Sequence, residues 1–496
     1  MVLLCVVQGC ERFAFLAMLP LFVRYAQERH TIAVPQALLI LALFQALAYL
    51  GGLPGGWLAD RIVGTRNATL LGAALLACGY GLLALERSFL LWPALLMMVL
   101  GHSAFRPGLH ALLARVADDD EHARERIFLW HYLAANLGYS AGSLYGEWAH
   151  ARAGWRLLFG GATAASAMAV MLLVTGLPSL RAQATRAVDQ SAIRSHTAGA
   201  ANMRAVWLLS GVAVIFWLTA QQAGSSLTVF AANNTTPTMT LLGHTMWIGP
   251  GHFAALHGLF VLAMLPAFLA LHGRKTERAP SAVGLLTWGY VATAGAFALM
   301  ALAALRGGDL GRVSGAWLVG CYLLLSLAEV FLAPLGMSLL TRLAPKRRAA
   351  QAVGLWFAGS AIGNGLGGVF GLCWDRWPHH RYFAALTVLS LAAAVPLFLG
   401  RRWLERHETQ TLLAHPADLE TCPSSASPRA PTRWAFMFGL ALPILLPLAL
   451  AVNTALSLPV RGVAAILCSL ALLFCGPVLF GHALLRWAQP AVLPSR

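Results

Sequence analysis

Residues 2–23 read VLLCVVQGCERFAFLAMLPLFV, an apolar run interrupted by an acid and a base, Glu11 and Arg12. As an α-helix, this run is long enough to cross the hydrocarbon core of a bilayer, which takes about 20 residues. A charge at the centre of such a helix costs roughly 2.5–3.5 kcal/mol on insertion scales, so charged residues there usually pair and face a wet cavity. The stretch therefore predicts a membrane helix that lines a functional pathway.

The composition of the whole chain agrees with this first stretch. The chain has 496 residues, of which 58% are hydrophobic and only 11% are charged. A soluble globular protein carries about 25% charged residues. Apolar runs recur along the chain without the period-two alternation of an outer-membrane barrel. We therefore expect an all-α polytopic membrane protein, because a lone helix satisfies its own backbone hydrogen bonds inside a bilayer.

The apolar runs predict fourteen spans in three blocks. The first block is 2–23, 35–58, 68–85, 90–116, 127–149 and 155–177; the second is 205–231, 253–271, 282–305, 316–340, 350–372 and 382–399; the third is 434–454 and 458–487. The predicted units are a bundle at 1–177, a polar loop at 178–204, a bundle at 205–399, a Ser/Pro-rich linker at 400–433 and a hairpin at 434–487. Two six-helix halves around a midplane site resemble the major-facilitator architecture, in which one half rocks against the other.

Basic residues are unevenly distributed between the two sides of these spans. Most Lys and Arg residues fall in the loops on the side of residues 178–204. By the positive-inside rule, that loop and both termini are cytoplasmic, and the chain sits in the inner membrane of a bacterium. The net charge of +16 then reflects loops beside a lipid bilayer, and we expect no nucleic-acid partner.

Enzyme chemistry has no support in the sequence. The eight cysteines fall almost entirely in apolar spans without the CxxC spacing of a metal site, so we interpret them as packing residues. We find no nucleophile–base pair and no metal-ligand cluster. We expect no enzyme, no metal and no cofactor, with protons as the coupling ion.

Two further ionisable residues fall inside predicted spans. Arg106 lies in the fourth span and Glu329 in the tenth. Together with Glu11 and Arg12 they place two acids and two bases in one apolar bundle. This combination predicts a transport pathway with proton-sensitive switching, because protonation of an acid weakens its pairing to a base.

Residues 55–66, GGWLADRIVGTR, resemble the signature loop of the facilitator superfamily, G-x-L-A-D-R-x-G-x-R. In that family the loop lies at the cytoplasmic gate, which makes Asp60 and Arg61 candidate gate residues. Paired glycines at its start allow close helix approach.

Five other segments resemble the proton-coupled oligopeptide transporter family. ERF at 11–13 resembles its E-x-x-E-R-F, FRP at 105–107 its F-K-P, and WHYLAANLG at 130–138 its F-Y-x-x-I-N-x-G. FWLTAQQAGSS at 216–226 is close to the bacterial F-W-x-x-x-E-Q-A-G-S-S. Glu329, PLG at 334–336, GLWF at 354–357 and GN at 363–364 match the tenth and eleventh helices. The chain is identified as a divergent member over about residues 1–400.

The resemblance implies a site for a di- or tripeptide. Arg106 would bind the peptide carboxylate and Glu329 its amine, and the two would pair as a gate in the empty site. Arg in place of the family's Lys adds bidentate carboxylate geometry. Glu11, Arg12 and Glu329 would couple transport to protons. The other predicted substrate-binding residues are Tyr132, Asn136, Gln221, Gln222, His257, Trp356 and Phe357.

Several positions depart from the family pattern. The first acid of the first motif is Gln8, and the tyrosine pair that follows the motif is Phe15 and Leu16. Leu19 replaces an arginine and Gln221 replaces the span-seven acid that pairs with it across the outer gate, so we expect an apolar outer gate. His257 aligns with the asparagine that helps hold the peptide amine. These changes leave selectivity for ordinary peptides open.

We expect a proton-coupled symporter of short peptides or peptide-like compounds. One alternative is transport of a non-peptide solute, such as an anion or a peptide-derived natural product. Another is a non-transporting receptor or scaffold. Against it, a site without a transport function should lose charged residues that are costly in a membrane, and this chain keeps Arg12, Arg106 and Glu329. The oligomeric state is open. The hairpin at 434–487 lacks acidic residues, and we expect it to be an accessory module outside the pathway.

Overall fold

The computed structural model describes residues 1–52, 55–56, 62–116, 121–176, 203–241, 244–272, 281–343 and 349–413. The predicted gate residues Asp60 and Arg61 lie outside these ranges. So do the predicted hairpin at 434–487 and nearly all of the loop at 178–204.

The first half of the chain folds into helices. They are α1 (Val2–Met18), η1 (Leu19–Leu21), α2 (Phe22–His30), α3 (Val34–Leu50), α5 (Thr65–Ala84), η3 (Ser88–Leu90), α6 (Leu91–Val116) and α7 (Glu121–Thr175). Residues from α1 to α2 form one apolar segment, Val2–His30. Within α7, Ala153 and Gly154 leave the helical backbone, and Gly154 has a φ of 71° that suits glycine. This kink divides α7 into two helices, as the two predicted spans at 127–149 and 155–177 require.

The second half contains more helices and one short hairpin. The elements are α9 (Met203–Ala220), η4 (Gln221–Gly224), α10 (Ser226–Asn233), β1 (Thr238–Leu241), β2 (His244–Trp247), α11 (Pro250–His272), α12 (Ala282–Gly307), α13 (Ala316–Leu343), α14 (Ala349–Gly371), α15 (His379–Leu399) and α16 (Arg401–Leu413). The antiparallel β1–β2 pair runs from Thr238 opposite Trp247 to Leu241 opposite His244.

The predicted all-α membrane architecture is confirmed. Each of the twelve spans predicted before residue 400 falls on one of these helical segments. Within the described ranges, nine segments are long and apolar enough to cross a membrane. The total of fourteen spans stays a prediction, because the last two lie outside those ranges.

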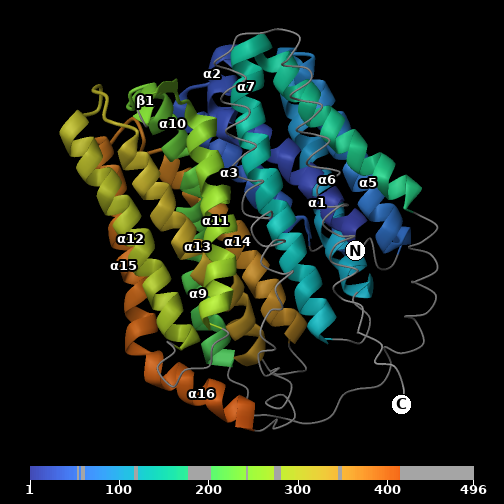
Figure 1. Cartoon of the computed structure of the whole chain (residues 1–496), viewed down its shortest axis with the longest axis vertical. Coiled ribbons are helices and arrows are strands. Elements are labelled where there is room, and N and C mark those ends of the chain that lie inside the picture. Colours follow the sequence, from blue (N-terminus) through green and yellow to red (C-terminus); the bar gives the residue numbers. More distant parts are fainter. Residues whose placement is uncertain are drawn as a thin grey trace, which may run out of the picture.

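The predicted linker at 400–433 begins with a helix, which corrects that part of the prediction. Residues 401–413 contain neither Gly nor Pro, and Arg401 Nε lies 2.7 Å from Glu405 Oε1 one turn later. Leu404 is fully buried in the core of the second half. The helix α16 is therefore packed against the bundle, at the end opposite the β1–β2 hairpin (Figure 1).

The two halves lie side by side. Figure 1 shows the helices up to α7, in blue to cyan, beside the helices from α9 onward, in green to orange. The closest approaches use small residues: a Cβ atom on Gly368 of α14 would collide with Ala42 of α3, and one on Gly258 of α11 would collide with Ser140 of α7. Such contacts let backbones approach closely, as is common between membrane helices.

A buried acid also joins the halves near the hairpin. Glu147 of α7 is fully buried, and its Oε2 accepts a 2.6 Å hydrogen bond from the backbone amide of Gly251. Gly251 is in the first turn of α11, where amides have no partner within the helix. Glu147 thus satisfies the N-terminus of a helix that belongs to the other half.

Candidate functional site

The first buried charge cluster is centred on Glu11 of α1. Its carboxylate lies 3.2 Å from Arg12 Nε, 3.1 Å from His102 Nδ1 and 3.6 Å from Arg106 Nη2. Gln8 Nε2 donates a further hydrogen bond of 3.2 Å. His102 and Arg106 are four residues apart on α6, so both project from one face toward α1. Only 2% of the Glu11 side chain is exposed, so these partners must compensate its charge.

Aromatic rings border the two guanidinium groups of this cluster. The Arg106 guanidinium lies 5.5 Å from the ring centre of Phe15 and 4.9 Å from that of Tyr49. Arg12 lies 5.9 Å from the Phe15 ring. Phe15 keeps the ring of the family's tyrosine and can make the same cation–π contacts without its hydroxyl. Leu16, by contrast, is buried in the core and contributes packing.

The second cluster is centred on Glu329 of α13. Tyr132 Oη donates a 2.8 Å hydrogen bond to Glu329 Oε1, and His257 Nε2 lies 2.6 Å from Glu329 Oε2. The other imidazole nitrogen of His257 lies 3.0 Å from Ser326 Oγ. Tyr132 belongs to α7 and His257 to α11, so this cluster bridges the two halves. Asn136, one turn after Tyr132, is buried and donates to the Tyr132 carbonyl at 3.1 Å.

The expected ion pair between Arg106 and Glu329 is not formed among the described residues. The acid nearest to Arg106 is Glu11, and each oxygen of Glu329 already has a partner in Tyr132 or His257. Arg12 interacts electrostatically with both Glu11 and Glu329. By its 3.2 Å contact with Glu11, Arg12 belongs to the first cluster.

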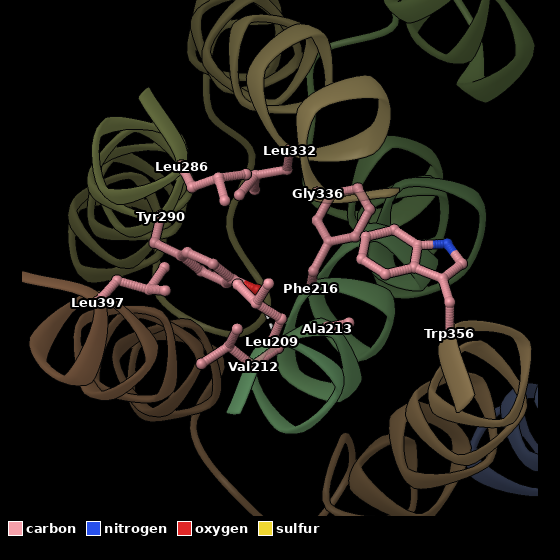
Figure 2. Close-up of a pocket in the computed structure, with 10 residues that line it drawn as sticks. All are labelled: Leu209, Val212, Ala213, Phe216, Leu286, Tyr290, Leu332, Gly336, Trp356 and Leu397. Atoms are coloured by element: carbon pink, nitrogen blue, oxygen red, sulfur yellow. Dashed lines mark hydrogen bonds between the residues drawn. The ribbon is translucent and has the colours of Figure 1, made fainter. Parts of the chain in front are cut away.

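Trp356 does not border either cluster. It is buried and packs against Gly336 in a small apolar hollow within the second half. Figure 2 shows the lining residues: Leu209, Val212, Ala213, Phe216, Leu286, Tyr290, Leu332, Gly336, Trp356 and Leu397. The Tyr290 hydroxyl donates to the Val212 carbonyl at 2.5 Å, so the hollow offers no free charged group to a ligand. The side chain of Phe357 is 40% exposed.

The side-chain oxygens of Gln221 and Gln222 accept hydrogen bonds within η4 and α10 and from α15. Gln222 Oε1 accepts from Ser226 Oγ at 2.6 Å and from Tyr382 Oη at 2.9 Å. Gln221 Oε1 accepts from Ser225 Oγ at 3.2 Å. These bonds hold the 3₁₀ turn η4 against α15. None of these bonds reaches the charge clusters at Glu11 and Glu329. The predicted substrate role of the two glutamines therefore stays a prediction.

The apolar contact expected in place of an outer-gate ion pair is present. A Cβ atom on Gly224 of η4 would lie 2.8 Å from Leu19 Cδ2 of η1, so the two segments touch through apolar atoms. Leu19 is buried in the core cluster that contains residues of both halves. No acid or base is left unpaired at this contact.

Comparison with known proteins shows which family the chain resembles. Residues 179–377 match the model of the POT family. Dipeptide and tripeptide permease A of Salmonella typhi is 24% identical over 408 residues, which are 72% of this chain and 80% of the permease. The di-/tripeptide transporter of Lactococcus lactis subsp. cremoris is 21% identical over 460 residues, 79% of this chain and 93% of the relative. The chain is similar to the POT family.

Solved structures share the fold of this chain. A peptide transporter POT in complex with sulfate is 21% identical and superposes with a TM-score of 0.71, covering 82% of this chain and 94% of that one. A POT family transporter in complex with 5-aminolevulinic acid is 20% identical with a TM-score of 0.69, covering 81% and 96%. The match to the family model and to the named permeases confirms the resemblance that the motifs predicted, and this family is one of transporters and not of enzymes.

Sequence reasoning missed two buried groups of this chain. His102 is fully buried beside Glu11, and its position four residues before Arg106 in an apolar helix was the available signal. Glu147 lies in the predicted fifth span, where an acid is as costly as it is in the first. Both polar groups complete contacts between helices, which a single sequence does not display.

Proposed function

We propose that this chain is a proton-coupled symporter that imports di- and tripeptides or peptide-like compounds by alternating access. The observation that carries the proposal is the pair of buried charge clusters, one on the first half at Glu11 and one bridging the halves at Glu329. The names of its relatives support the substrate class.

The two clusters suit the two ends of a peptide. Arg106 would bind the carboxylate, since a guanidinium offers two parallel hydrogen bonds to it. Its Nε has no hydrogen-bond partner in the structure and is buried. The cluster at Glu329 would face the other end of the substrate, with Tyr132 and Asn136 nearby for the peptide amide.

Glu11 is the proposed proton site of the first half. Its negative charge faces Arg12, His102 and Arg106 at once. Protonation would cancel that charge, leave the guanidinium groups in mutual repulsion, and free Arg106 for a substrate carboxylate. A change in the charge of one group would thus shift the balance between conformations of the two halves. The membrane potential adds about 2.3 kcal/mol per charge per 100 mV.

The proposed location is the plasma membrane of a bacterium with both termini cytoplasmic, on the strength of the basic loops. The β1–β2 hairpin then lies at the outer end. In the same scheme Asp60 and Arg61 serve the cytoplasmic gate, and the hairpin at 434–487 lies outside the pathway.

Uptake into proteoliposomes tests the proposal. Labelled dipeptides should accumulate with an inward proton gradient and fail to accumulate without one. Arg106→Ala and Glu329→Ala should abolish accumulation, whereas Arg24→Ala should not, because Arg24 forms a solvent-exposed pair with Glu28 outside both charge clusters. An absence of gradient-driven uptake across a full panel of free and N-blocked dipeptides and tripeptides would refute the proposal.

A further inference from the structure

The carboxylate of Glu329 has an unusual partner for an acid that should receive a substrate amine. His257 Nε2 lies 2.6 Å from Oε2, and Tyr132 Oη donates to Oε1 at 2.8 Å. The imidazole is 9% exposed and the carboxylate 25%, so the pair sits largely away from solvent. A substrate ammonium would have to displace His257 or share the carboxylate with it.

The hydrogen-bond partners of His257 and Glu329 indicate how many protons the two side chains hold together. Ser326 Oγ has one hydrogen, and its nearest acceptor is the Tyr322 carbonyl at 2.7 Å. Ser326 Oγ is then left to accept from Nδ1–H of His257 at 3.0 Å. The 2.6 Å contact on the other side needs one more proton between Nε2 and Glu329 Oε2. The pair is therefore either imidazolium with carboxylate or imidazole with carboxylic acid, and both forms have a net charge of zero.

Among the residues that the structure describes, the charged neighbour that acts on the pair is a cation. On α7 the ring of Tyr139 lies 5.6 Å from that of His257, and on α13 the ring of Tyr322 lies 6.3 Å from it. From α1, Arg12 acts on Glu329 electrostatically. When the His257–Glu329 pair is neutral overall, the first cluster contributes one negative side chain, Glu11, and two positive ones, Arg12 and Arg106. This excess of positive charge disfavours binding of a substrate ammonium group and favours binding of a substrate carboxylate.

We propose that His257 acts as a built-in cation on Glu329 and takes the place of a substrate amine. The site then selects its substrate by the carboxylate end. It takes peptides or peptide-like carboxylates whose amino group is blocked or absent. This inference rests on the proposed transport function and names its substrate class. Arg106, whose buried Nε lacks a partner, supplies the charge-assisted contact to the substrate carboxylate. Such a substrate leaves the contacts of Glu329 with His257 and Tyr132 intact.

Matched ligands that differ at one end test the proposal. Gradient-driven uptake into proteoliposomes is measured for labelled dialanine, N-acetyl-dialanine and dialanine amide. The wild-type protein should take up N-acetyl-dialanine at least as well as dialanine and should reject the amide. Preference for dialanine over its N-acetyl form by about tenfold or more, equivalent to about 1.4 kcal/mol, overturns the proposal and leaves the transport function standing. An absence of uptake for all three ligands overturns both.

A substitution then assigns the effect to His257. His257→Asn removes the imidazole and its proton while keeping a polar side chain, so the ratio of dialanine to N-acetyl-dialanine uptake should rise by about tenfold or more. His407→Asn is the matched control, because His407 lies on α16 and bonds the Trp403 carbonyl. An unchanged ratio in folded His257→Asn protein overturns the proposal. If that variant does not fold, the wild-type comparison of blocked ends still decides it.

Discussion

Glu147 of α7 accepts a hydrogen bond from the backbone amide of Gly251 in α11, across the boundary between the two halves. Both groups are buried, and glycine is required at this approach because a Cβ on Gly251 would lie 2.9 Å from the Glu147 side chain. The contact exists only while the halves are joined at the hairpin end. Alternating access requires that it break when this end opens.

Glu147→Ala should favour the conformation that is open at the hairpin end. The substitution leaves a buried amide without its acceptor, which costs about 1–3 kcal/mol in the joined conformation and much less once water reaches the amide. Spin labels on Arg152→Cys and Leu310→Cys, both exposed positions of that end, report the separation of the halves in a background without the native cysteines. The distance distribution should shift to longer values.

Glu86→Ala is the control for this measurement. Glu86 also lies at the hairpin end, but its partners Arg29 and Arg156 both belong to the first half. Its removal should leave the distance between the two labels unchanged. Equal distributions for Glu147→Ala and the wild type would show that this contact does not hold the halves together.

Glu11→Gln should separate substrate exchange from proton coupling. A glutamine resembles the protonated carboxylic acid in shape and charge, so the cluster would stay in its protonated form at every pH. Exchange of labelled for unlabelled substrate should continue, whereas accumulation driven by a proton gradient should be lost. Glu28→Gln is the matched control, because Glu28 pairs with the exposed Arg24. Retained gradient-driven accumulation in Glu11→Gln would exclude Glu11 as the proton site.

Hydropathy predicted the helices because a bilayer forces each segment to satisfy its own backbone hydrogen bonds. The motifs likewise singled out Glu11, Arg12, Arg106 and Glu329, which the structure places in two clusters of polar contacts. The partners of these groups were harder to predict, because they depend on how each helix is rotated about its axis. Arg106 meets Glu11 and not Glu329, since His102 and Arg106 share the face of α6 that turns toward α1.

The same limit explains the other differences. Trp356 belongs to a motif of the predicted pocket, yet α14 directs it toward Gly336 inside its own half. The helix α16 was predicted as linker because residues 400–433 as a whole are polar and rich in Ser and Pro, and the burial of Leu404 cannot be read from composition. His257 was found by alignment to a motif, but its bond to Glu329 required the packing of α11 on α13.

The attachment of α16 should weaken at acid pH. Burial opposes ionisation of Glu405, but hydrogen bonds from Ser281 Oγ and Arg401 Nε outweigh it and lower the pKa of this carboxyl. A lowered pKa in the folded state stabilises α16 above the ordinary Glu value of about 4.3, and this contribution is lost as the pH falls through the folded-state pKa. A spin label on Arg402→Cys should become more mobile between pH 7 and pH 3. In a variant that also carries Glu405→Gln, the mobility of the label should depend less on pH. A pH dependence that is the same with and without Glu405→Gln would contradict this role of Glu405.

Truncation should separate α16 from the residues that follow it. Burial of a leucine stabilises a fold by about 1.5–3 kcal/mol, and Leu404 is fully buried in the core of the second half. A chain that ends after Gly400 loses this residue together with the bonds of Glu405 to Ser281 and Arg401. It should therefore unfold at a lower temperature in detergent.

A chain that ends after Leu413 keeps α16 and should match the full-length protein in thermal stability. Its uptake per folded molecule should also be unchanged, because the predicted hairpin at 434–487 carries no acid for proton or substrate chemistry. Loss of uptake in the longer truncation, with folding and insertion intact, would place that hairpin in the transport mechanism.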